Sequence, residues 1–161
     1  MKKLGFSLIE LMVTIVIMGV IAAVAVPKLF GFMAKSKATE ITVAAGTYIK
    51  MQDVYIHEHT QGGTWSNIGY KSPAGNSTGK ASTQNFEYDA EQTTHNWTAS
   101  AIVSLNDCQK GKKWFINYEL DPPHHMKYWA STDDETNCIA ALIPSFSKLS
   151  NTTTAITKAG E

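Results

Sequence analysis

The chain opens on a long apolar run that changes, near residue 28, into an amphipathic pattern. The uncharged segment Leu11–Val26 would span about 24 Å as a helix. Together with Phe6–Ile9 it is long enough to cross a bilayer. Beyond Lys28, apolar side chains recur every three or four positions, which is typical of one helix face. These positions are Ile41, Ala44, Ala45, Tyr48, Gln52 and Tyr55. We therefore predict one long helix over Phe6–His59.

Pro27 lies inside this predicted helix. A proline removes one backbone donor, and its ring clashes with the carbonyl four residues earlier. Gly19 precedes it and Gly31 follows it. We expect a kink or a softened stretch between Gly19 and Gly31, with helix on both sides.

The chemistry changes from Thr64 onward, where Ser, Thr, Asn and Gly become frequent. Ser72–Gln84 is predicted to be an exposed loop. Four stretches have β character, and the second and third should form an antiparallel hairpin. The four are Phe86–Asp89, Trp97–Leu105, Lys113–Leu120 and Met126–Ser131. The pattern predicts an α+β fold, in which the C-terminal half of the helix packs on a small antiparallel sheet.

This pattern divides the chain into three parts. Residues 6–27 would span a membrane, 28–59 form the amphipathic half of the helix, and 60–161 form a β-rich head. The polar tail from Ser145 is expected to wrap the surface or fray. Lysines number 14, arginine is absent, and acids also number 14. This balance does not indicate general attraction to nucleic acid.

The two cysteines, Cys108 and Cys138, lie in a chain that must cross or leave a membrane. An oxidising compartment favours a disulfide between them, although two free buried thiols remain the alternative. The bond would join the hairpin loop to the segment after the last strand. Neither cysteine has metal-ligand spacing to another Cys or His, so no zinc site is predicted.

Glu10 is the one acid at the head of the apolar segment. An unpaired carboxylate in hydrocarbon costs several kcal/mol, so it must be neutralised, snorkel to the interface, or meet a cation on another chain. The surrounding residues, Lys2-Lys3-Leu4-Gly5 followed by Phe6-Ser7-Leu8-Ile9-Glu10, resemble the class III signal of type IV pilins and of the related secretion pseudopilins. The resemblance covers about residues 1–55.

The resemblance implies that residues 1–5 are a leader, which a membrane-embedded aspartic prepilin peptidase removes after Gly5. It implies that Phe6, the new terminus, is then N-methylated. The family's glutamate falls four residues past the cut, where Glu10 lies. Gly19 and Pro27 also match positions where pilins carry a glycine and a helix-bending proline. In a stack of subunits, Glu10 of one chain would meet the Phe6 amine of the next.

A member of this family is a structural protein with no cofactor or enzymatic activity. It would wait in the bacterial inner membrane and assemble into an extracellular helical filament of like subunits. An assembly platform and cytoplasmic ATPases of the inner membrane would drive that assembly. The expected tasks are adhesion and twitching motility, with the surface ligand open. The near alternative is a pseudopilin of a type II secretion system.

Another interpretation treats the N-terminus as an ordinary secretory signal. Ala23-Val24-Ala25 fits the A-x-A cleavage pattern, and the mature chain would then begin at Val26. An acid at the start of the apolar region and helical periodicity beyond Pro27 both weigh against it. Sequencing the mature terminus distinguishes Phe6 from Val26.

Several weaker patterns remain in the predicted head. His57-x-His59 and His124-His125 are candidate transition-metal ligands, and Asp133-Asp134-Glu135 with Asn137 offers oxygen ligands for calcium. Solvent exposure is the favoured interpretation of both. Four tryptophans would stack on sugars if exposed in a row, but core packing is favoured. They are Trp65, Trp97, Trp114 and Trp129. No spacing indicates a catalytic set.

Overall fold

The computed structural model describes residues 5–91, 96–121, 125–133 and 138–152. The chain divides into two compact units, Met1–Met33 and Ala34–Glu161, which share the long helix α1, Leu8–His59. The Ser7 carbonyl accepts hydrogen bonds from the backbone N–H groups of Glu10 and Leu11, at 3.1 and 3.3 Å, so regular helix begins just after Ser7. The helix continues through Pro27. The kink near it stays a prediction, as do the boundaries of the leader and of the membrane-spanning segment.

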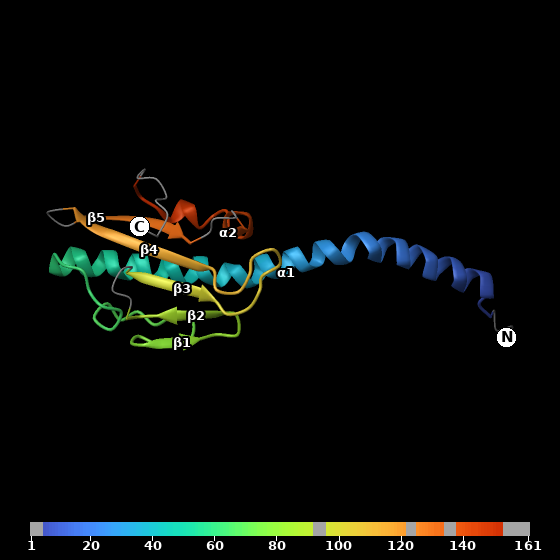
Figure 1. Cartoon of the computed structure of the whole chain (residues 1–161), viewed down its shortest axis with the longest axis horizontal. Helices are drawn as coiled ribbons and strands as arrows, with labels where there is room; N and C mark the ends of the chain where they lie inside the picture. Colours follow the sequence, from blue (N-terminus) through green and yellow to red (C-terminus); the bar gives the residue numbers. More distant parts are fainter. Residues whose placement is uncertain (1–4, 92–95, 122–124, 134–137, 153–161) are drawn as a thin grey trace. The chain divides into compact units, whose positions relative to one another are not determined.

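The second unit is built on a five-stranded antiparallel sheet in the order β1-β2-β3-β4-β5, with the C-terminal half of α1 running along it (Figure 1). Each strand pairs with the next in sequence, so the sheet is a meander. The predicted α+β class and the hairpin between β3 and β4 are both confirmed. The strands are β1 Lys80–Ser82, β2 Phe86–Asp89, β3 Trp97–Ala101, β4 Lys113–Asp121 and β5 His125–Thr132.

Two strand predictions are wrong. β1 lies in the segment predicted to be only a loop, where its pairing with β2 makes it a strand. The strand predicted over Trp97–Leu105 ends at Ala101, because the chain turns there. Ala101 N–H donates to the Lys112 carbonyl and its own carbonyl accepts from Gly111 N–H, both at 2.8 Å. These bonds close a loop over residues 102–112.

One face of α1 forms the core of the second unit together with β2, β3, β4 and β5. Every residue of the predicted buried stripe is buried except Tyr55, which is half-buried, and the prediction missed the buried Ile49 and Ile56. The sheet contributes large side chains with no exposed surface, including Phe86, Trp97 and Trp114. Truncating such an aromatic residue to alanine typically costs about 3–5 kcal/mol. The buried helix residues are Ala34, Ala38, Ile41, Ala44, Ala45, Tyr48, Ile49, Gln52 and Ile56.

The chain beyond β5 returns along the edge of that strand. Helix α2, Cys138–Leu142, leads to a 3₁₀ helix, Ser147–Leu149. Asn151 then acts like a neighbouring strand. Its side chain accepts from Tyr128 N–H at 2.8 Å and donates to the Met126 carbonyl at 2.7 Å. The described part of the tail therefore covers an edge that would otherwise present unpaired backbone groups.

Candidate functional site

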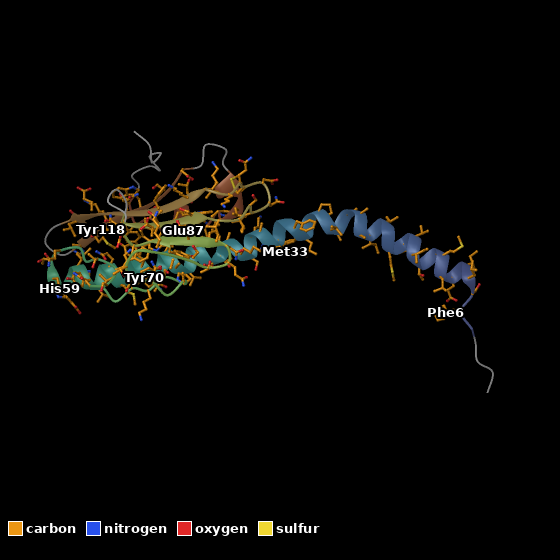
Figure 2. The ribbon with its side chains drawn as sticks, turned by 60° about the horizontal axis from the view of Figure 1, so that its bottom comes forward. Phe6, Met33, His59, Tyr70, Glu87 and Tyr118 are labelled. Carbon is orange, nitrogen blue, oxygen red and sulfur yellow. A yellow bond between two sulfur atoms is a disulfide. The ribbon has the colours of Figure 1, made fainter. Side chains whose placement is uncertain are left out.

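The helix in the first unit is apolar around its whole circumference. Among its large side chains, Leu8 is 75% exposed, Val16 63% and Phe32 70%. Figure 2 shows these side chains extending from the ribbon between Phe6 and Met33. An 18-residue window of α1 has a mean hydropathy of 2.6 and no buried residue. It is the one helix among the described residues that is long and apolar enough to cross a membrane.

Such a helix is unstable in water as it stands. An amphipathic surface helix needs a partner on one face only, whereas a helix that is apolar all round must be covered on all sides. Leaving one Val, Leu or Ile side chain in water forgoes about 1.5–3 kcal/mol. Over the whole segment this amounts to tens of kcal/mol. Lipid, or the same segment of other molecules, must therefore surround it.

Glu10 is exposed in the first turn of α1. Within the described part of the chain, no ion pair includes it. A negative charge in the first turn interacts favourably with the helix dipole. Ser7-x-x-Glu10 also has the spacing of a capping box, a pattern that sequence reasoning missed although the residues show it. Glu10 thus has two candidate roles, one local to the helix end and one with another chain.

Gly5 and Phe6 precede the helix and are both exposed. A Cβ atom added at Gly5 would meet nothing within 4 Å, and the backbone there is not in the left-handed region. Folding of the described chain therefore places no demand for glycine at this position. Gly19 and Gly31 likewise have open space around them.

The cysteine pair is joined as predicted. Cys108 and Cys138 form a disulfide with Cα atoms 5.4 Å apart. Cys108 lies in the loop between β3 and β4 and is 2% exposed. Cys138 begins α2. The bond therefore fastens the β3–β4 loop to the segment after β5.

Buried polar contacts fix the sheet against the helix. Glu40 on α1 accepts at its Oε1 from the hydroxyls of Tyr88 at 2.8 Å and Thr83 at 2.9 Å. The Tyr70 hydroxyl donates to the Ala44 carbonyl at 3.2 Å and accepts from Trp97 Nε1 at 3.0 Å. Spacing could not reveal these contacts, since the partners lie 26 to 48 residues apart.

The Gln52 side chain joins the last part of α1 to the segment that follows the helix and to β4. With its amide oriented to satisfy both partners, its nitrogen donates to the Gly63 carbonyl at 3.1 Å and its oxygen accepts from Gly63 N–H at 2.9 Å. The same oxygen accepts from the Tyr118 hydroxyl at 3.0 Å. Gly62 must be small, since a Cβ there would lie 1.8 Å from that hydroxyl.

Alkaline pH should destabilise the head through its tyrosines. Burial raises the pKa of Tyr48, Tyr70 and Tyr88, and the Glu40 carboxylate raises that of Tyr88 further. In the unfolded chain a tyrosine ionises near pH 10, so above that pH the unfolded state binds fewer protons. Stability is then intact below about pH 10 and falls above it by about 1.4 kcal/mol per pH unit for each such tyrosine.

Urea unfolding of the full chain in detergent micelles between pH 8 and 11 measures this loss. The Tyr88→Phe variant is the matched control. Because it has one buried tyrosine fewer, its free energy of unfolding should fall less steeply with pH. A free energy of unfolding that stays constant up to pH 11 would contradict the effect of burial.

The structure also places the tryptophans and several of the candidate metal ligands predicted in the head. Trp65, Trp97 and Trp114 are buried, so they pack in the core and cannot form a sugar-stacking row. Asp133 accepts from Lys113 N–H at 2.7 Å, while Asp134, Glu135 and Asn137 lie outside the described residues, as does His124. Among the described residues, no group of three or more His, Cys, Asp or Glu side chains could hold a metal ion.

Comparison with known proteins agrees with this arrangement. Residues 1–26 match the family described as the prokaryotic N-terminal methylation motif. The chain is 34% identical over 76 residues to the type IV major pilin protein PilA of Myxococcus xanthus (strain DK1622), covering 47% of this chain and 34% of that protein. It is 30% identical over 152 residues to a fimbrial protein of Neisseria meningitidis serogroup B (strain MC58), covering 85% of this chain and 84% of that one.

The second alignment covers more than four fifths of both chains, whereas the chain covers only about a third of the Myxococcus protein. The motif, the relatives, the long apolar helix and the antiparallel sheet all agree on one assignment. The chain belongs to the type IV pilin family.

Proposed function

We propose that this chain is the structural subunit of a type IV pilus, which assembles through its N-terminal helix into a surface filament for adhesion or motility. The observation that carries the proposal is a helix apolar on every side, with a single carboxylate at its head. The relatives named as a type IV major pilin and a fimbrial protein support a pilus over a secretion pseudopilus.

Processing prepares the subunit for assembly. A prepilin peptidase cuts after Gly5, and Phe6 becomes an N-methylated terminus. The cut creates an α-amino group that carries a positive charge near neutral pH, and methylation keeps that charge. The cut also removes Lys2 and Lys3, which would resist extraction from the cytoplasmic face. The described residues place no packing demand on Gly5, which supports a role for this glycine in recognition by the peptidase.

Glu10 of one subunit then meets the Phe6 amine of its neighbour. Each charge offsets part of the other's desolvation penalty, so the pair favours one register during insertion. The rest of the helix leaves lipid for the equally apolar helices of other subunits, which is nearly neutral in hydrophobic terms. Assembly therefore needs an external motor. An inner-membrane platform with cytoplasmic ATPases fits that need.

Mass spectrometry of filaments sheared from cells tests the proposal. The expected product is a chain that begins at Phe6, carries one added methyl group and contains an intact Cys108–Cys138 disulfide. It should be abundant in the sheared fraction. A pseudopilin would remain with the cell envelope. A secreted protein would begin at Val26 and appear in the medium without shearing. Either result would overturn the assignment to a pilus.

A further inference from the structure

The end of α1 and the start of β5 bring two histidines together. His57 lies in the last turn of the helix and His125 is the first residue of the strand. Their ring centroids are 5.9 Å apart and the ring planes are nearly perpendicular, at 87°. In the sequence each belongs to a separate histidine pair. The fold joins one member of each pair, at the end of the head where His59 and Tyr118 lie in Figure 2.

The separation suits two imidazoles on one metal ion. Metal–nitrogen distances of about 2.0–2.1 Å at a tetrahedral centre place two ring centroids roughly 5 Å apart, against the 5.9 Å between His57 and His125. The rings must therefore approach by less than about 1 Å. The His57 side chain is 47% exposed and His125 is also exposed. Neither ring is held by core packing, so each can rotate to turn a ring nitrogen toward a shared ion.

The surroundings favour a cation. Asp53 lies one helical turn before His57, with its Oδ1 3.8 Å from His57 Nε2. At this distance the carboxylate does not hydrogen-bond to the ring, but its negative charge favours a cation beside His57. Asp121 faces His125 across the β4–β5 pairing, and its Oδ2 lies 3.1 Å from Lys127 Nζ. Asp53 therefore places a negative charge beside His57, while Lys127 offsets the charge of Asp121 near His125.

We propose that His57 and His125 form a two-imidazole site for a borderline divalent transition metal such as Zn²⁺, Ni²⁺ or Cu²⁺. Imidazole nitrogen suits these ions, whereas Ca²⁺ and Mg²⁺ prefer oxygen ligands. Water completes the coordination, in keeping with the lack of a third protein ligand among the described residues. A bound ion links the end of α1 to the start of β5.

Isothermal titration of the untagged full-length chain in detergent micelles with zinc chloride tests the site. One zinc ion should bind per chain. His57→Ala and His125→Ala should each weaken binding by about tenfold or more, because either change leaves a single imidazole. Zinc should also raise the melting temperature of the wild type, and this increase should disappear in both variants.

His59→Ala is the matched control. His59 lies at the same helix end, but its ring stacks on Tyr55 at 4.1 Å and its Nδ1 lies 3.2 Å from the Tyr55 carbonyl oxygen. Its removal should leave zinc affinity unchanged. His57→Gln and His125→Gln repeat the test if an alanine variant fails to fold. No zinc binding by the wild type, wild-type affinity in the His57 variants, or an equal loss in His59→Ala would each overturn the proposal.

Discussion

Replacing Glu10 with leucine should leave a cleaved, membrane-inserted subunit that is nearly absent from sheared filaments. In the proposed filament, the substitution leaves the Phe6 amine of the neighbouring subunit without its partner in an apolar environment. Breaking a buried ion pair in this way costs about 3–5 kcal/mol. That corresponds to a roughly 100-fold or larger shift against incorporation at each subunit. Immunoblots of the membrane and sheared fractions measure both pools.

Glu10→Gln separates the two candidate roles of this side chain. Glutamine keeps the capping-box pattern with Ser7 but removes the charge. If the ion pair governs assembly, this variant fails as the leucine variant does. If Glu10 only caps the helix, glutamine restores filaments. Glu58→Gln makes the same chemical change at an exposed site near the other end of α1 and should assemble normally. Wild-type filament yield from Glu10→Leu would refute both roles.

The hydrophobic pattern predicted the helix and most of the sheet because these elements are specified locally. The run from Leu11 to Val26 requires helix in lipid, since every backbone group there needs an internal partner. β2, β4 and β5 contain aromatic and β-branched residues at strand spacing. β1 has no such pattern. Its three residues, Lys80–Ser82, become a strand through pairing with β2, and Lys80 Nζ lies 3.3 Å from Asp89 Oδ2 across that pair.

The functional residues of the first unit could be predicted from the sequence, whereas the contacts within the head mostly could not. Glu10 stands out because a single acid beside a long apolar run is conspicuous without any knowledge of the fold. Glu40 does not stand out, because its position is polar on the helix and its partners come from a distant turn and strand. The approach of His57 to His125 likewise depends on where β5 begins beside α1. Such contacts are properties of the folded chain.

Removing the disulfide should strongly destabilise the head. The bond joins residues 30 positions apart in the sequence, with β4 and β5 between them. Loss of a native disulfide from a small domain costs about 2–5 kcal/mol, chiefly because the unfolded chain regains conformational freedom. For a unit of this size the melting temperature should fall by about 10 °C or more. Thermal melting of a Cys108→Ala, Cys138→Ala double variant measures the change.

The same loss should loosen the segment that covers β5. The disulfide holds the start of α2, and the chain from α2 to Asn151 then runs back along the strand. Tyr128 N–H donates to Asn151 and Ala130 N–H to Ser150, so both amides should exchange faster in the double variant. Reducing the disulfide of the wild type should lower its melting temperature to that of the double variant. The same reductant should leave the melting temperature of the double variant unchanged. A shift below about 2 °C in the double variant would mean that core packing alone holds this segment in place.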